Sequence, residues 1–172
     1  MGILSGNPKN EPMHYGEISG IWAFALKAKS AISYYQAFLN HAGDKDLQQL
    51  LRDIIEQARQ EANECEKLLK DNGITPPPGL PERPSEKWEA IPPGARFSDQ
   101  EIAATAAGDI SMGLVACSTI MGEAIREDIA ALFAKFHAAK AQLGLRALRL
   151  NKEKGWLIPP PLEIERTEEV TV

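Results

Sequence analysis

The sequence contains few of the residues on which most catalytic and metal sites depend. Its 172 residues include two cysteines and three histidines, and it has no glycine-rich phosphate loop, nucleophile elbow or spacing typical of a catalytic triad. The two cysteines, Cys65 and Cys117, each fall on the apolar side of an expected helix, which is typical of inert core thiols. These absences favour a protein without catalytic activity and without a cofactor.

Positive charge is also scarce. The chain has 19 lysines and arginines against 24 aspartates and glutamates, a formal net charge of -5. Binding to nucleic acid or to an anionic membrane depends on positive charge, and no basic cluster offsets the balance locally, so we expect neither partner. The N-terminal sequence MGILSGNPKNEP lacks the apolar core of a signal peptide. Together with two widely separated cysteines, this predicts reduced thiols and a cytoplasmic location.

Proline, in contrast, is abundant and gathers in residues 73–97 and again near the C-terminus. A run such as Pro76-Pro77-Pro78 cannot continue a helix, because proline fixes φ and lacks the backbone N–H. As an extended connection of about 25 residues at roughly 3.1 Å each, the first segment reaches further than a helix of about 28 residues, which is roughly 42 Å long. We therefore predict an ordered crossover that runs along a helix pair, with Trp88 as its largest anchor.

The proline-rich segment is part of a longer internal similarity. Residues 68–83 align with residues 149–166 at a shift of about 83, and the same shift brings Glu17 onto Glu101. The chain thus reads as a tandem repeat of one unit, in which a helical hairpin is followed by glycine, an apolar residue and a run of prolines. The prediction is a single domain, residues 1–172, with hairpin one at 14–72, a crossover at 73–97, hairpin two at 98–154 and a proline-rich tail at 155–172.

Each hairpin is predicted to contain two long helices, because apolar residues recur at steps of three and four. Asp44 is a plausible N-cap, and Ser98 followed by Glu101 is a capping box. Gly73 and Gly155 are suited to end helices. The expected fold class is all-α, a four-helix bundle in which two antiparallel hairpins are joined by a long crossover, the connectivity of ferritin-like bundles.

The first and third helices lack the polar face of a typical surface helix. The third contains a single charged residue, Asp109, between Ile102 and Gly122. It is long enough to span a bilayer, but its small residues and interior aspartate oppose insertion, and we expect no membrane insertion. Because monomers seldom expose large apolar patches, we predict a homodimer through helices one and three. The candidate dimer surface consists of Phe24, Tyr34, Phe38, Met112 and Val115.

Four charged residues are expected near the helix midpoints and close to the apolar stripes. Isolated buried charges are unfavourable, so these four, whose charges sum to zero, could pair at the level where a ferritin holds metal. Alternatively, two or more bend out to solvent, which the long lysine stems allow. The ligand pattern of di-iron bundles is missing, since helix two offers Glu61 and Glu64 without a histidine. The candidate midplane polar cluster consists of Lys29, Glu61, Asp109 and Lys140.

Several turn and cap motifs resemble those of one known family. The motifs are EISGIW at 17–22, NGITPPPG at 72–79, FSDQEI at 97–102 and EKGWLIPPP at 153–161. They are similar to the domain of unknown function 3231 family of spore-forming Gram-positive bacteria, over nearly the whole chain. The resemblance implies a ferritin-like bundle distantly similar to spore-coat F-type proteins, located in the forespore or spore coat. Since that family has no established activity, the resemblance assigns no catalytic or ligand residues.

Three functions are compatible with the sequence. The leading hypothesis is a non-enzymatic helical-bundle protein that acts through self-association or partner binding in sporulation or the spore coat. The first alternative is a degenerate ferritin-like metal-binding protein or oxidoreductase. The second is a carrier that holds a small apolar ligand in a cavity beside the small-residue third helix. A metal and ligand inventory of the purified protein would separate the three.

Overall fold

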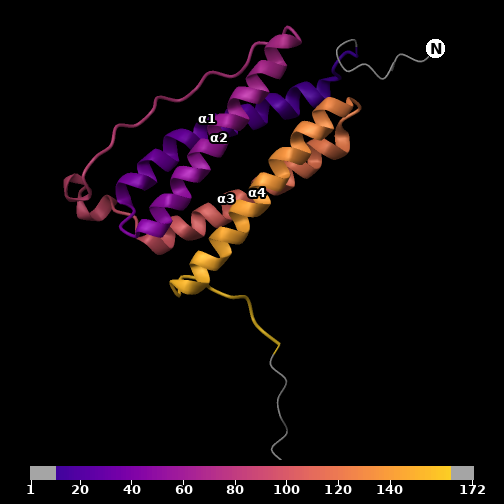
Figure 1. Cartoon of the computed structure of the whole chain (residues 1–172). Coiled ribbons are helices and arrows are strands. Elements are labelled where there is room, and N and C mark those ends of the chain that lie inside the picture. Colours follow the sequence, from indigo (N-terminus) through magenta and orange to yellow (C-terminus); the bar gives the residue numbers. More distant parts are fainter. Residues whose placement is uncertain (1–10, 164–172) are drawn as a thin grey trace, which may run out of the picture.

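A computed structural model describes residues 11–163 of the chain. In this part there are helices and no strands, so the predicted all-α helical bundle is confirmed. The long helices form two antiparallel hairpins, α1 with α2 and α3 with α4 (Figure 1). Two short 3-10 helices lie in the connection between the hairpins. The elements are α1 (Tyr15–His41), α2 (Lys45–Asp71), η2 (Trp88–Ala90), η3 (Pro93–Ala95), α3 (Asp99–Glu123) and α4 (Glu127–Glu153).

The helix ends follow the predicted caps. The Asp44 carboxylate accepts hydrogen bonds from the first-turn backbone N–H groups of α2, and Ser98 and Glu101 form the capping box of α3. Such caps satisfy N–H groups that have no partner within the helix. Gly73 and Gly155 adopt φ values of 74° and 70° after α2 and α4, a conformation that glycine adopts without strain. The predicted helix stops are therefore confirmed, while the tandem-repeat interpretation stays a prediction.

The apolar core is divided into two clusters, and every long helix contributes to both. One cluster includes Tyr35 and Leu51 and lies toward the α1–α2 turn. The other includes Phe133 and Leu69 and lies toward the α3–α4 turn. Burying one large apolar side chain contributes about 1.5 to 3 kcal/mol, so the two clusters supply most of the stabilisation. Between them is the level at which Glu61 is buried in α2.

The crossover, residues 73–97, runs beside the α1–α2 hairpin from the end of α2 to the start of α3 (Figure 1). Side chains of α1 hold its backbone: Trp22 Nε1 donates to the Thr75 carbonyl at 3.1 Å and Ser33 Oγ donates to that of Pro81 at 3.0 Å. The predicted ordered crossover is confirmed. The prediction that Trp88 anchors the crossover is not confirmed, because its side chain is 45% exposed. Trp88 packs under the Arg96 guanidinium, whose carbon lies 3.6 Å from the ring centroid.

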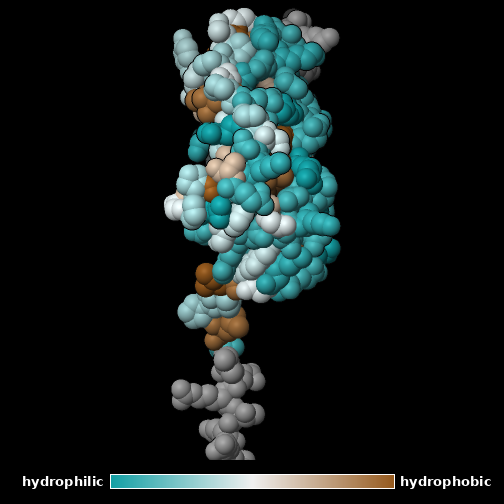
Figure 2. Space-filling view, turned by 90° about the vertical axis from the view of Figure 1, so that its left-hand side faces the viewer, coloured by the Kyte–Doolittle hydropathy of each residue, from teal (hydrophilic) through white to brown (hydrophobic). Residues whose placement is uncertain are grey.

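The start of the tail packs on the bundle and the rest leaves it. Trp156 packs against the first core cluster, and its carbonyl accepts a hydrogen bond from Gln100 at 3.4 Å. Ile158 is 81% exposed, and the space-filling view shows hydrophobic tail residues below the body (Figure 2). The predicted docking of the first part of the tail is confirmed, whereas its predicted acidic end lies mostly outside the described residues.

Candidate functional site

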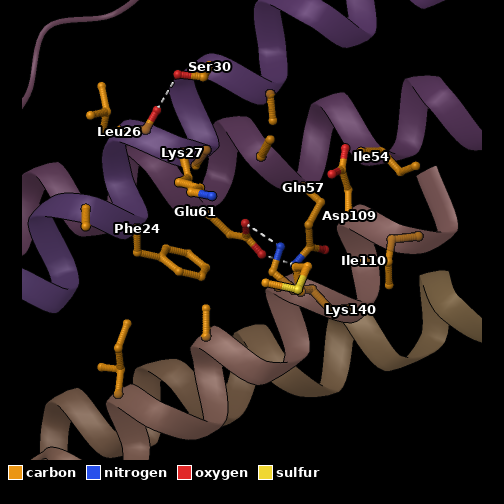
Figure 3. Close-up of a pocket in the computed structure, with 18 of the residues that line it drawn as sticks. Phe24, Leu26, Lys27, Ser30, Ile54, Gln57, Glu61, Asp109, Ile110 and Lys140 are labelled. Carbon is orange, nitrogen blue, oxygen red and sulfur yellow. Dashed lines mark hydrogen bonds and ion pairs between the residues drawn. The ribbon is translucent and has the colours of Figure 1, made fainter. Parts of the chain in front are cut away.

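A cavity of about 770 Å³ lies between the two hairpins. Its exposed lining residues belong to α1 and α3, whereas the lining residues from α2 and α4 are at least partly buried. The cavity therefore opens between α1 and α3, and its floor is formed by α2 and α4 (Figure 3). Sites for small molecules have volumes of roughly 300 to 1,000 Å³, so this cavity is large enough to be one. Its larger apolar lining residues are Phe24, Ile54, Ile110, Met112, Ile120 and Leu143.

An ion pair between α2 and α4 lies on the cavity floor. Lys140 Nζ is 2.8 Å from Glu61 Oε2, and Gln57 Nε2 donates to Glu61 Oε1 at 2.9 Å (Figure 3). Glu61 is 2% exposed, and both of its carboxylate oxygens thus have a partner. A Cβ on Gly113 of α3 would be 2.9 Å from Lys140 Cδ, so this glycine allows α3 to lie against the lysine stem.

A second polar group faces the same cavity from α3. Asp109 Oδ2 accepts hydrogen bonds from the hydroxyls of Tyr34 at 2.7 Å and Tyr35 at 3.0 Å. Burial raises the pKa of both tyrosines above the usual value, and the Asp109 carboxylate raises them further. Both tyrosines therefore stay protonated hydrogen-bond donors at neutral pH. Within residues 11–163, the other carboxylate oxygen, Asp109 Oδ1, accepts no hydrogen bond.

The candidate midplane residues do not form a single cluster. Glu61 and Lys140 pair with each other, and Asp109 lines the same cavity but binds tyrosines instead of a lysine. Lys29 lies outside the cavity, where it pairs with Glu66 and donates to the Pro77 carbonyl. The expectation that Lys29 joins the cluster is wrong, because the crossover passes over that side of α1 and supplies a nearer acceptor.

The partners of the predicted polar residues were missed by sequence reasoning. Gln57 lies one helical turn before Glu61, a spacing at which side chains meet, and this signal was available. The sequence analysis assigns Tyr34 to an apolar dimer surface and makes no prediction for Tyr35, although a tyrosine hydroxyl forms a hydrogen bond when it is buried. No local signal identified Glu66, since its contact with Lys29 depends on how α1 and α2 pack.

The candidate dimer surface is also rearranged. Phe24 is 7% exposed and packs edge-on against Phe133, with ring centroids 5.0 Å apart. Phe38 is partly buried and packs edge-on against Phe97 at 5.4 Å. Both aromatic residues are covered because α1 is surrounded by α2, α3 and the crossover. Met112 and Val115 are 65% and 58% exposed, so the α3 part of the predicted dimer surface remains uncovered.

We call this surface the outer face of α3. It has no charged residue, and its side chains are small apart from one methionine, one valine and two threonines. The segment Pro93–Glu123 is long and apolar enough to cross a membrane by length and composition alone, and few of its residues are buried. The outer face consists of Ala104, Thr105, Ala107, Gly108, Ser111, Met112, Val115, Ser118, Thr119 and Gly122.

The ferritin alternative requires several metal-binding side chains in one place. Among residues 11–163, no three histidine, cysteine, aspartate or glutamate side chains gather closely enough to share a metal ion. Cys65 and Cys117 are buried and not disulfide-bonded. Burial raises the pKa of the Cys65 thiol, and raises that of Cys117 to about 11. Since the thiolate is the reactive form, neither cysteine is activated for nucleophilic chemistry.

Comparison with known proteins places the chain beside uncharacterised and spore-coat relatives. A family model described as "Protein of unknown function (DUF3231)" matches residues 1–169. The chain is 51% identical over 169 residues to uncharacterized protein YvdQ of Bacillus subtilis (strain 168), covering 98% of this chain and 99% of that protein.

Two solved structures share the fold. The first is that of "a putative spore coat protein (BH2358)" from Bacillus halodurans C-125, which is 47% identical with a TM-score of 0.91 and covers 92% of this chain and 100% of that one. The second is a conserved hypothetical protein, Rv2844, from Mycobacterium tuberculosis, with a TM-score of 0.64 over 80% of this chain and 99% of that one. At 14% identity, this second likeness concerns the fold alone.

Proposed function

We propose that this chain, which belongs to the DUF3231 family, is a non-enzymatic spore protein that works by self-association through the outer face of α3. The observation that supports the proposal is the exposure of this face. Val115 is 58% exposed near the middle of a helix that carries no charge on this side. In the other hairpin, the crossover covers the corresponding long helix, α1, whereas the described part of the tail reaches α3 only near Gln100, Ala104 and Ala107.

The composition of the face suits contact with a second copy. The centres of protein interfaces are depleted of charged residues, and the small side chains of Ala107, Gly108 and Ser111 allow a facing helix to approach closely. In a dimer with two-fold symmetry, the same surface patch is used by both copies. Two α3 helices facing each other would bury Met112 and Val115 in one contact and cover the apolar surface of this helix.

A spore location is supported by similarity. The Bacillus halodurans protein described as a putative spore coat protein is 47% identical to this chain and shares its fold with a TM-score of 0.91. A coat is built from proteins that contact one another, so a coat protein needs at least one surface for association. The outer face of α3 is the uncharged helix surface that meets this need among the described residues.

The location of the interface can be tested by site-specific variants in sedimentation velocity. Val115→Glu places a charge at the centre of the proposed contact and should convert the dimer to a monomer with an unchanged circular dichroism spectrum. The matched control is Leu145→Glu, at a residue of α4 that is 50% exposed and outside the outer face. Loss of the dimer in the control as well, or its persistence in Val115→Glu, would argue against α3 as the interface.

A further inference from the structure

We propose that the cavity between the hairpins is a binding site for an elongated apolar amine, with the amino group held by Asp109. The site lies in the interior of the bundle and does not rest on the proposed function, although Met112 and Thr119 belong both to the cavity lining and to the outer face of α3. The amine gives the chemical class of the ligand for the hypothesis that the protein carries a small apolar molecule. The observations behind it are the volume of the cavity, its apolar walls, the unused acceptor on Asp109 and the charges that line it.

Small residues from both hairpins line the cavity where the hairpins meet. They are Gly20, Ala23 and Ala31 of α1 and Gly113 and Ala116 of α3. Each hairpin packs tightly within itself, so the missing side-chain volume is left between the hairpins. The remaining walls are large apolar side chains such as Phe24 and Leu143, which suit a hydrocarbon chain.

Asp109 is the partly buried acceptor available to a ligand, whereas Glu123, the third carboxylate of the lining, is exposed at the end of α3. Both carboxylate oxygens of Glu61 are occupied by Lys140 and Gln57. Asp109 uses Oδ2 for the two tyrosine hydroxyls, which fix the side chain in place, and Oδ1 accepts no hydrogen bond within the described residues. A ligand that donates a hydrogen bond can therefore reach Oδ1 without breaking an existing contact.

The charges around the cavity favour a cation over an anion. The ionisable lining residues are three carboxylates and two lysines, which gives a formal charge of -1. Lys140 is paired with Glu61, and Lys27 is at the exposed rim on α1. Asp109 therefore has no lysine partner, and a protonated amine would neutralise it. A carboxylate ligand would instead meet Asp109 without compensation, which is unfavourable in a partly buried site.

Calorimetric titration with three probes of one chain length separates the possible ligands. Decylamine, 1-decanol and decanoate are each added below the concentration at which micelles form. The expected order of affinity is the amine first, the alcohol second and the carboxylate last, with the amine at least about tenfold tighter than the carboxylate, as one charge-assisted hydrogen bond implies. Equal affinity for all three probes, or tighter binding of decanoate, would overturn the proposal.

Three variants locate the site. Asp109→Asn keeps an acceptor for the tyrosine hydroxyls. It should lower the affinity for decylamine by about tenfold or more and leave the affinity for 1-decanol unchanged. Ala116→Leu fills the cavity from α3 and should abolish binding of both probes. Ala138→Leu, at an exposed residue of α4 outside both the cavity lining and the outer face of α3, is its control and should bind as the native chain does. Unchanged decylamine binding in Ala116→Leu would place the site elsewhere and overturn the assignment, whatever the folding of Asp109→Asn.

Discussion

Lys140 of α4 donates to the carboxylate of Glu61 in α2 at 2.8 Å, at the level where the two core clusters meet. Glu61 is 2% exposed, while the Lys140 side chain retains 16% of its surface. The pair joins one hairpin to the other across the cavity floor. Because the Glu61 carboxylate is buried, Lys140 points into the bundle to contact it. The alternative in which the lysine bends out to solvent therefore does not apply to this pair.

The first prediction concerns the stability of this pair. Lys140→Met leaves a buried carboxylate without its cation and should lower the free energy of unfolding by about 3 kcal/mol or more. The double variant Glu61→Leu with Lys140→Met removes both charges and should recover most of that loss. The measurement is the urea midpoint of each variant. If the separate effects of Glu61→Leu and Lys140→Met simply add in the double variant, the pair has no energetic coupling.

The second prediction concerns Asp109 and Lys140, which the sequence suggested as a pair. Since Asp109 binds Tyr34 and Tyr35 instead, Asp109→Ala combined with Lys140→Met should give additive effects on the urea midpoint. Asp109→Ala combined with Tyr34→Phe should show coupling, because the first change already removes the partner of the Tyr34 hydroxyl. Strong coupling between Asp109 and Lys140 would contradict the observed arrangement.

The third prediction is an acid dependence at the α3–α4 turn. The Arg126 guanidinium is buried and donates to Asp128 at 3.0 and 2.7 Å, and these bonds hold the pKa of Asp128 below its usual value. A carboxylate with a lowered pKa in the folded state stabilises the protein above its unfolded pKa, about 3.9, and this contribution is lost as the pH falls through the folded pKa.

As the pH is lowered from about 5 to about 2, the free energy of unfolding should decrease more steeply in the native chain than in Asp128→Asn. Asp71→Asn is the control, because the Asp71 side chain is 63% exposed and its ion pair with the Lys67 ammonium is long, at 3.9 Å, and therefore weak. The measurement is urea denaturation across this pH range. Parallel pH profiles for the native chain and Asp128→Asn would show that the Arg126 contact contributes nothing to stability.

The fourth prediction concerns the crossover. Asn40 holds it at two points, donating from Nδ2 to the Pro84 carbonyl at 3.0 Å and accepting at Oδ1 from the Glu86 N–H at 3.1 Å. Asn40→Ala should therefore speed tryptic cleavage after Lys87 without changing the free energy of unfolding by more than about 1 kcal/mol. Gln49→Ala, which removes a hydrogen bond to Asp53 on the surface of α2, should leave the cleavage rate unchanged.

The sequence was sufficient for the helices and their ends, and insufficient for the partners of side chains. Capping residues such as Asp44 and Ser98 act within one turn, so their effect is local and readable. The positions of Glu61 and Lys140 near one level also followed from helix geometry. The role of Phe24 did not, because a helical stripe shows which residues share a side of α1 but not that Phe133 and Phe136 of α4 pack against Phe24.

The most direct test of self-association is the mass of the native chain in sedimentation equilibrium over a range of micromolar concentrations. The chain has a mass of 18.8 kDa, and association through the outer face of α3 predicts a species of twice that mass that dissociates on dilution. A native chain that remains at 18.8 kDa at high micromolar concentration would contradict the account.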